Sequence, residues 1–405
     1  MPRTFEVVNL GCKVNRVESD RFEAVLRARG FQERTEQGAH VVVVNTCTVT
    51  GEAEKKTRKA VRRALRQNPR ATVYVTGCAA VMDAATYQAM DERVRVLAKP
   101  DLLEELQYPT GEHLSLSPVP SADRVRVGVK VQDGCDNACT YCIVHVARGA
   151  ARSVAADEVI ARCCSLVEEG VPEVMLTGIN LGAYEHEGRG LPDLLKRLLE
   201  EVPWGSSSRM RLSSLEPQDV TEELAGVIAR SRGLICRHLH LPLQSGSSRV
   251  LHQMGRRYDR EGFAATVALL RELLPSLSLT TDVIVGFPGE TEEDFQATLD
   301  LCQEAAFSKI HVFPYSLRAG TPAAVRTDQI PFTVKQERAR VLRTLSDELR
   351  HLDLVGRLGS RERVVVEREA WGRTESYHEV PLSPELAVGA LLEVEMVSGM
   401  LECHL

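Results

Sequence analysis

Three cysteines stand close together in the segment Gly134–Cys142, where Cys135, Cys139 and Cys142 have the spacing C-x3-C-x2-C. Three thiolates can fill three corners of an iron–sulfur cube and leave its fourth iron without a protein ligand. An open iron of this kind can chelate a substrate, so the spacing favours catalysis over simple electron storage. A loop of reduced thiols and a zinc turn are the alternatives.

A second set of cysteines is spread over the first eighty residues. Cys12, Cys47 and Cys78 each follow a short β-branched run, and we predict these runs to be parallel strands. The runs are Phe5–Asn9, Val41–Asn45 and Thr72–Thr76. Because the carboxyl ends of parallel strands share one edge of a sheet, we expect the three thiols to meet there and hold a second cluster.

Two helices are predicted between these strands, at Val14–Arg29 and Glu52–Arg66. Residues 51–70 contain eight basic and two acidic residues, a net charge of +6 in a chain whose total charge is −6. Four of the bases fall on one helical face at i, i+4, i+7 and i+11. They are Lys55, Lys59, Arg62 and Arg66. The face is either a solvated surface or a binding site for nucleic-acid phosphates.

The composition is that of a water-soluble protein of more than one domain. The chain has 405 residues, of which 43% are hydrophobic and 26% charged. No apolar run approaches the ~18 residues of a membrane span, and no signal peptide is evident, so we expect a cytoplasmic protein. Eleven cysteines in such a chain favour metal chemistry over disulfides.

The second half of the chain predicts a partial barrel. A linker at 107–124 separates an α/β domain at 1–106 from a long alternation of strands and helices at 125–354, and a small domain follows at 355–405. The six expected barrel strands are Val125–Val131, Glu173–Leu176, Met210–Ser213, Arg237–Leu241, Leu279–Val285 and Lys309–Phe313. Six units are too few for a closed eightfold barrel, so we predict an open (β/α)6 barrel.

Polar and glycine-rich segments follow these strands and should line the rim where the cysteine loop also sits. They are Thr177–Asn180, Ser214–Pro217, Gln244–Gly246 and Gly286–Glu290. A helix at Val334–Leu354 leads to three strands that predict a small antiparallel β-barrel. These strands are Arg363–Glu367, Ser376–Val380 and Leu391–Val397. Residues 361–405 contain four Arg and nine Glu, a net charge of −5. This charge is unfavourable for a domain that binds phosphates.

Many segments, in order, resemble those of the radical S-adenosylmethionine (SAM) methylthiotransferase family, and the resemblance covers nearly the whole chain. The tail, including Gly372–Glu375, is similar to the β-barrel called a TRAM domain. The other matching segments are Asn45–Thr50, Gly134–Arg148, Leu176–Tyr184, Arg211–Pro217, His238–Gly246, Thr281–Glu290 and His311–Ser316.

The resemblance implies two 4Fe–4S clusters and SAM as cofactors. Cys12, Cys47 and Cys78 would hold the auxiliary cluster, and Cys135, Cys139 and Cys142 the cluster that binds SAM. Reductive cleavage of SAM would give a 5′-deoxyadenosyl radical that takes hydrogen from an inert C–H bond. Sulfur from the auxiliary cluster would then be inserted as a methylthio group, with its methyl from a second SAM.

The resemblance also assigns cofactor-binding residues. Tyr141 would abut the adenine of SAM, and Thr177, Gly178 and Asn180 would meet its amino group. Three rim residues are candidates for SAM ribose, carboxylate or substrate, with helix capping or rim hydrogen bonding as the alternative; they are Glu216, Gln244 and Asp282. His145 departs from the family, which usually has proline there, and we interpret it as a tolerated loop residue.

Within the family, two features most resemble enzymes that modify carbon 2 of N6-threonylcarbamoyladenosine beside the anticodon of tRNA. They are the amino-acid sequence Asn45–Thr50 and the basic helix that follows it. The alternatives are an aspartate of a ribosomal protein, isopentenyladenosine in tRNA, and a non-enzymatic iron–sulfur protein that senses redox state or binds RNA. The expected partners are the tRNA anticodon stem-loop, a flavodoxin-type reductant and a sulfur donor, without DNA or a membrane.

Overall fold

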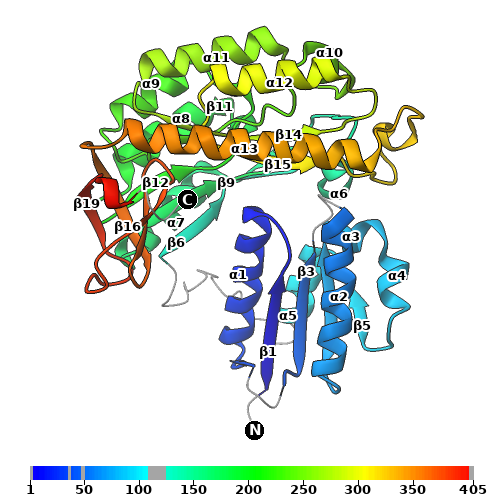
Figure 1. Cartoon of the computed structure of the whole chain (residues 1–405). Helices are drawn as coiled ribbons and strands as arrows, with labels where there is room; N and C mark the ends of the chain where they lie inside the picture. Colours follow the sequence, from blue (N-terminus) through cyan, green and yellow to red (C-terminus); the bar gives the residue numbers. More distant parts are fainter. Residues whose placement is uncertain (1–2, 35–37, 47–50, 108–124, 401–405) are drawn as a thin grey trace. The chain divides into compact units, whose positions relative to one another are not determined.

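A computed structural model describes residues 3–34, 38–46, 51–107 and 125–400 of the chain (Figure 1). The chain divides into two units. The first comprises Met1–Asp123 and Cys142–Ala150, and the second comprises Arg124–Tyr141 and Ala151–Leu405. The small tail therefore groups with the barrel, and the three-domain division at residues 106, 124 and 354 stays a prediction. Most of the predicted linker lies outside the described residues.

The first unit is built on a five-stranded parallel sheet in the order β2-β1-β3-β4-β5. Its strands are β1 (Thr4–Asn9), β2 (Gln32–Glu33), β3 (Val41–Thr46), β4 (Thr72–Gly77) and β5 (Val94–Val96). The three predicted strands are confirmed. Strands β2 and β5 were not predicted, because two or three residues give too short a pattern to recognise.

Helices cover both faces of this sheet. On one face, Phe22 of α1 (Lys13–Ala28) and Leu102 of α5 (Lys99–Gln107) share a core with Val43. On the other face, α2 (Gly51–Gln67) and α3 (Cys78–Met82) pack on the alternate strand residues, and α4 (Ala84–Gln88) follows α3. A β-branched strand buried on both faces by helices is what a parallel α/β sheet requires.

The second unit contains the open barrel. All six predicted strands are present, as β6 (Arg126–Lys130), β9 (Glu173–Thr177), β12 (Arg209–Leu212), β13 (His238–His240), β14 (Ser278–Val285) and β15 (Lys309–Pro314). They pair in parallel as β12-β9-β6 and β13-β14-β15. Isolated bridges from Met210 to Ile235 and from Ser214 to His240 join β12 to the segment of β13.

Seven helices pack against these strands or lie near their ends. They are α7 (Ala156–Glu168), α8 (Leu191–Glu201), α9 (Glu222–Arg230), α10 (Ser248–Gln253), α11 (Arg260–Leu273), α12 (Glu292–Glu304) and α13 (Phe332–Gly356). Figure 1 shows α13 running along β14 and β15. Apolar residues of alternate strand positions, such as Val174, Met210 and Val283, form one core with these helices. The intervening positions face away from the helices, toward the inside of the open barrel.

The C-terminal tail forms an antiparallel sheet in the order β18-β17-β16-β19. Its strands are β16 (Arg361–Arg368), β17 (Trp371–Thr374), β18 (Glu379–Pro381) and β19 (Leu391–Glu395). The predicted strand at Ser376–Val380 is wrong in its first half, and β17 was missed. A tight turn follows β17, with Tyr377 in the left-handed region at φ +74°.

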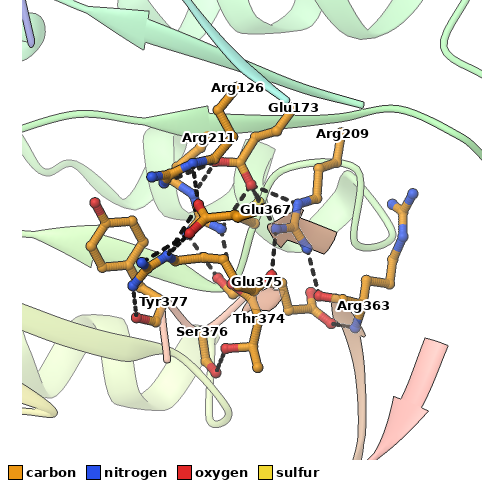
Figure 2. A network of polar contacts seen from close by, with 12 residues as sticks. Arg126, Glu173, Arg209, Arg211, Arg363, Glu367, Thr374, Glu375, Ser376 and Tyr377 are labelled. Carbon is orange, nitrogen blue, oxygen red and sulfur yellow. Dashed lines mark hydrogen bonds and ion pairs between the residues drawn. The ribbon is translucent and has the colours of Figure 1, made fainter. Parts of the chain in front are cut away.

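A buried carboxylate joins the barrel to this sheet (Figure 2). Glu173 is fully buried and accepts hydrogen bonds from Arg209 Nε and Arg211 Nε, both at 2.8 Å. The remaining guanidinium nitrogens of the two arginines donate to backbone carbonyls of the sheet, for example Arg211 to Thr374 and Glu375 at 3.0 Å. The two arginines thus bind the barrel acid and the sheet backbone together.

Several glutamates of the tail form ion pairs with arginines of the same unit. Glu367 lies 2.5 Å from Arg126 Nε. Glu375 accepts from Arg237 and Glu362 from Arg357, both at 2.8 Å. Several tail carboxylates are thus neutralised within the unit, so the net charge of −5 is a poor guide to the charge that a partner meets.

Glu173→Gln should lower the free energy of unfolding by about 3–5 kcal/mol, because it leaves Arg209 and Arg211 buried beside an uncharged partner. Burial by itself raises the pKa of Glu173, but the two arginines outweigh it and hold the pKa well below its usual range. Denaturant titration measures the decrease in stability, and amide exchange should accelerate in β16 and β17.

Glu201→Gln is the matched control, because Glu201 pairs with Arg197 at the protein surface. It should leave the denaturation midpoint unchanged. A Glu173→Gln protein as stable as the unsubstituted chain would show that the buried pairs do not hold the sheet to the barrel.

Candidate iron–sulfur and SAM site

The cysteine loop leaves strand β7 (Gln132–Asp133), which pairs with β8 (Arg152–Ser153). Within the second unit, Cys135 Sγ accepts from the backbone N–H of Asn137 at 3.4 Å, and Cys139 Sγ accepts from Arg256 Nη1 at 3.3 Å. Burial raises the pKa of the Cys135 thiol, so a bound metal is what would favour its thiolate. Donors aimed at sulfur suit a cluster, because such hydrogen bonds tune its potential.

The third cysteine begins the segment Cys142–Ala150, which groups with the first unit. Its sulfur accepts from the backbone N–H of Val144 at 3.4 Å, at the start of helix α6 (Val144–Arg148). His145 lies on this short helix, and its buried Nδ1 has no hydrogen-bond partner among the described residues. The predicted loop residue is therefore helical.

The cysteine loop is also anchored at its middle. Thr140 donates from its backbone N–H to Met254 O at 2.9 Å and from its hydroxyl to Gln253 O at 2.8 Å. Gly255, with φ +72°, allows this approach, because a Cβ there would lie 3.3 Å from Ala138 O. The loop is thus held on the end of α10.

Gln132 ties the cysteine loop to the next predicted rim segment. Its side-chain amide donates to Asp133 O at 3.0 Å and Gly134 O at 2.8 Å, and its carbonyl oxygen accepts from Asn180 N at 2.9 Å. Gly178 leaves room for this side chain, because a Cβ there would lie 3.0 Å from it and would push it aside. The structure therefore places the segment from Thr177 to Asn180 beside the start of the cysteine loop.

Asn180 presents an unused acceptor at this place. Its side-chain oxygen is buried and accepts no hydrogen bond from the described residues. A buried acceptor of this kind needs a donor, and the ammonium group of SAM would supply one. The residues present therefore fit the cofactor that the sequence predicts.

A buried ion pair lies against the cysteine loop. Arg256 pairs with Glu216, and it also donates to Tyr141 Oη at 3.4 Å and to Tyr258 Oη at 3.1 Å. Burial raises the pKa of Glu216. Arg256 thus connects the predicted rim residue Glu216 with Tyr141, the residue predicted to abut the adenine of SAM.

Gln244 and Asp282 belong to neighbouring strand segments. The backbone N–H of Gln244 donates to Asp282 O at 2.8 Å, and Gln244 has φ +65°. This left-handed conformation turns the chain at the end of the strand segment. Asp282 lies in the middle of β14, and its side chain is 31% exposed. The two are neighbours through their backbones.

Two of the three N-terminal cysteines, Cys12 and Cys78, lie at the carboxyl edge of the first sheet. Cys12 is the exposed N-cap residue of α1, and Cys78 is the buried first residue of α3. Gly77, with φ +94°, is needed before Cys78, because a Cβ would lie 2.5 Å from Thr46 O. Cys47 follows the central strand β3 but lies outside the described residues.

Asn15 organises this edge. Its side-chain amide donates to Thr46 O at 2.8 Å, and its side-chain oxygen lies 3.7 Å from Cys12 Sγ. The same oxygen accepts from Arg148 Nη2 at 2.5 Å, and Arg148 Nη1 donates to the buried carboxylate of Glu18 at 3.0 Å. Arg148 therefore fastens the segment that begins with Cys142 to the edge that carries Cys12.

The predicted basic face of α2 is confirmed as a solvent-facing surface. Lys55, Lys59, Arg62 and Arg66 are exposed, whereas Val61 and its neighbours along the other face are buried. Gln132, Arg256, Tyr258, Asn15 and Arg148 are site residues that the sequence did not single out.

Parts of the chain match two described protein families. Residues 129–302 match the Radical SAM superfamily, and residues 4–98 match Uncharacterized protein family UPF0004. The structure of the radical SAM methyltransferase TsrM from Kitasatospora setae is similar, with a TM-score of 0.57 and 17% identity over 80% of this chain and 77% of that one. At this identity the likeness shows the fold alone.

Curated relatives are more similar in sequence. The threonylcarbamoyladenosine tRNA methylthiotransferase MtaB of Bacillus subtilis is 41% identical over 84% of this chain and 79% of the relative. MtaB of Chlamydia pneumoniae is 35% identical over 97% and 95%. The tRNA-2-methylthio-N(6)-dimethylallyladenosine synthase of Carboxydothermus hydrogenoformans is 32% identical over 98% of each chain.

The fold and the matches define a radical SAM enzyme. More particularly, the chain belongs to the radical SAM methylthiotransferase family. No helix among the described residues is long and apolar enough to cross a membrane.

Proposed function

We propose that this chain inserts a methylthio group at carbon 2 of N6-threonylcarbamoyladenosine in tRNA. The observation that carries the proposal is its 41% identity over 362 residues to an enzyme named for that substrate. Relatives named for dimethylallyladenosine are less similar, at 32–33% identity. The ribosomal-protein alternative rested on the acidic tail, and much of that acidity is paired with arginines of the same unit.

The proposal includes two 4Fe–4S clusters and SAM. Cys135, Cys139 and Cys142 would hold the SAM-binding cluster; Cys12, Cys47 and Cys78 would hold the auxiliary one. When bound, these groups supply the electron, the radical, the sulfur and the methyl group of the reaction.

The residues of the chain would position this chemistry. Arg256 donates to Cys139 Sγ and brings positive charge to a cluster held by thiolates. Glu216 pairs with Arg256 and so orients it. Asn180 offers its buried oxygen to the SAM ammonium group, while Gln132 keeps its segment beside the cysteine loop.

The remaining partners belong to the same proposal. A flavodoxin-type protein would deliver the electron, and a separate donor would restore the sulfur. A tRNA substrate places the enzyme in the cytoplasm.

The function is tested by mass spectrometry of tRNA nucleosides from cells that lack this protein. We expect the methylthio-threonylcarbamoyl nucleoside to disappear and its precursor without sulfur to accumulate. Retention of the methylthio-threonylcarbamoyl nucleoside, with disappearance of the methylthio-dimethylallyl nucleoside instead, would contradict the proposed substrate.

Anaerobically reconstituted protein should contain about eight iron atoms per chain, because two cubane clusters hold about four each. Cys12→Ala and Cys139→Ala should each lower the iron content to about four per chain. Cys139→Ala should also abolish formation of 5′-deoxyadenosine from SAM and dithionite, which a redox sensor would not form.

Cys164→Ala is the control, because Cys164 is a partly exposed cysteine on α7 that belongs to neither predicted ligand set. Its iron content should match that of the unsubstituted protein. An unchanged iron content in Cys12→Ala would refute the auxiliary cluster.

Reversing the charge of Lys55, Lys59 and Arg62 to Glu should weaken tRNA binding and reduce its salt dependence. The log–log slope should fall by about 0.7–0.9 for each phosphate that the protein no longer neutralises. Fluorescence anisotropy at several salt concentrations measures both quantities. Reversal of three exposed arginines elsewhere, Arg230, Arg340 and Arg343, is the control for net charge. Equal effects of the two triple variants would show that α2 has no specific role.

A further inference from the structure

The inner face of β13, β14 and β15 carries a polar cluster, defined as His240, Asp282 and His311. Neighbouring residues such as Leu239, Val283 and Ile310 pack in the core beneath the helices. Because side chains alternate along a strand, the cluster faces the inside of the open barrel. Asp282 and His311 are register partners.

The three side chains converge on one place. Their ligand atoms all lie within 4.8 Å of one another, and His240 Nε2 is 3.3 Å from Asp282 Oδ2. The imidazole rings of His240 and His311 have centroids 5.8 Å apart. The side chains of His240 and Asp282 are 15% and 31% exposed, so a ligand can reach them.

Hydrogen bonds beneath the cluster fix its orientation. Thr280 Oγ1 lies 2.9 Å from His240 Nδ1 and 2.9 Å from His238 Nε2. The ring of His238 in turn stacks on Tyr377 of the tail, with centroids 4.5 Å apart. His240 therefore uses its Nδ1 in a hydrogen bond with Thr280, and its Nε2 points toward Asp282. Three paired strands hold the cluster, which gives it the rigidity that a binding site needs.

The cluster also lies on the strand that leads to the cofactor side of the barrel. Four residues after His240, the chain reaches Gln244, and the intervening carbonyl of Leu243 accepts from Tyr258 Oη at 3.1 Å. Tyr258 contacts Arg256, which donates to Cys139 Sγ. The backbone of residues 240–243, followed by the contacts of Tyr258 and Arg256, thus connects the cluster with the cysteine loop.

We propose that the cluster recognises the polar substituent on N6 of the target adenosine, an inference that rests on the proposed function. A threonylcarbamoyl group carries ureido N–H groups, a hydroxyl and a carboxylate. Asp282, oriented by His240 Nε2, can accept from the N–H or O–H donors, and an imidazole N–H group of His311 can donate to the carboxylate.

The same chemistry discriminates against a hydrocarbon substituent. A dimethylallyl group would cover these polar side chains without offering them a hydrogen bond, and that desolvation is unfavourable. Sites built to hydrogen-bond a substrate group reject analogues that lack it far more strongly than apolar pockets reject polar ones. The cluster is therefore a determinant of substrate choice within the family.

Two imidazoles and one carboxylate can also hold a divalent metal ion. A metal ion would have to replace the contact between His240 Nε2 and Asp282 Oδ2, whereas an organic ligand that donates to Asp282 can keep it. A metal ion is therefore a separate outcome of the test.

The test compares three anticodon stem-loops with cluster-loaded enzyme and SAM: one with threonylcarbamoyladenosine, one with its threonine carboxylate converted to the carboxamide, and one with plain adenosine. The unsubstituted enzyme should bind the first at least about tenfold more tightly than the other two. His311→Gln and His240→Gln should each weaken binding of the first about tenfold and leave binding of plain adenosine RNA unchanged.

His351→Gln is the matched control, because His351 is an exposed histidine on α13. It should keep the full preference. Thermal unfolding checks that each variant is folded, and the carboxamide stem-loop tests the inference on the unsubstituted enzyme even where a variant fails to fold.

The inference is overturned if the unsubstituted enzyme binds the three stem-loops equally, or if the preference survives His311→Gln. The proposed function still holds in that case, provided that the methylthio product forms. Failure of the unsubstituted enzyme to form that product overturns the proposed function itself. A stoichiometric divalent metal beyond the cluster iron, absent from His311→Gln, would identify a metal site instead.

Discussion

The carboxyl ends of parallel strands share one edge of a sheet, and this constraint determines where the described cysteines of both sets lie. In the first unit it brings Cys12 and Cys78 to the edge that β3 also reaches. In the second unit it brings the cysteine loop beside the segment Thr177–Asn180, through Gln132. Residues distant in sequence can therefore come together at one edge of a sheet.

Buried acids paired with arginines hold segments of the chain together in both units. Glu18 pairs with Arg148 and fixes the segment that starts at Cys142, while Glu173 pairs with arginines that hold the C-terminal sheet. A buried carboxylate with such partners is a costly arrangement unless every charge is satisfied, so each network tolerates few substitutions. The tail is consequently a structural part of the second unit, and its acidic composition reflects this role.

The sequence predicted the three central strands of the first sheet, the six barrel strands and the long helices α1, α2 and α13, because each has a clear apolar pattern. It missed β17 and extended β18 too far, because the polar run from Thr374 to Tyr377 gives no sign of a turn with positive φ at Tyr377. The ligand cysteines could be proposed from spacing and strand order. Gln132, Arg256 and Arg148 could not, because their partners lie at separations along the chain that local patterns do not encode.

The central claim is that both clusters of this chain serve one methylthiolation reaction on a threonylcarbamoyl-modified tRNA. The most direct measurement is a single-turnover reaction of the purified, anaerobically reconstituted protein with the modified anticodon stem-loop, SAM and dithionite, followed by mass spectrometry of the digested nucleosides. The account predicts the methylthio-threonylcarbamoyl nucleoside together with 5′-deoxyadenosine. Formation of 5′-deoxyadenosine by fully loaded protein, without any methylthio nucleoside, would contradict it.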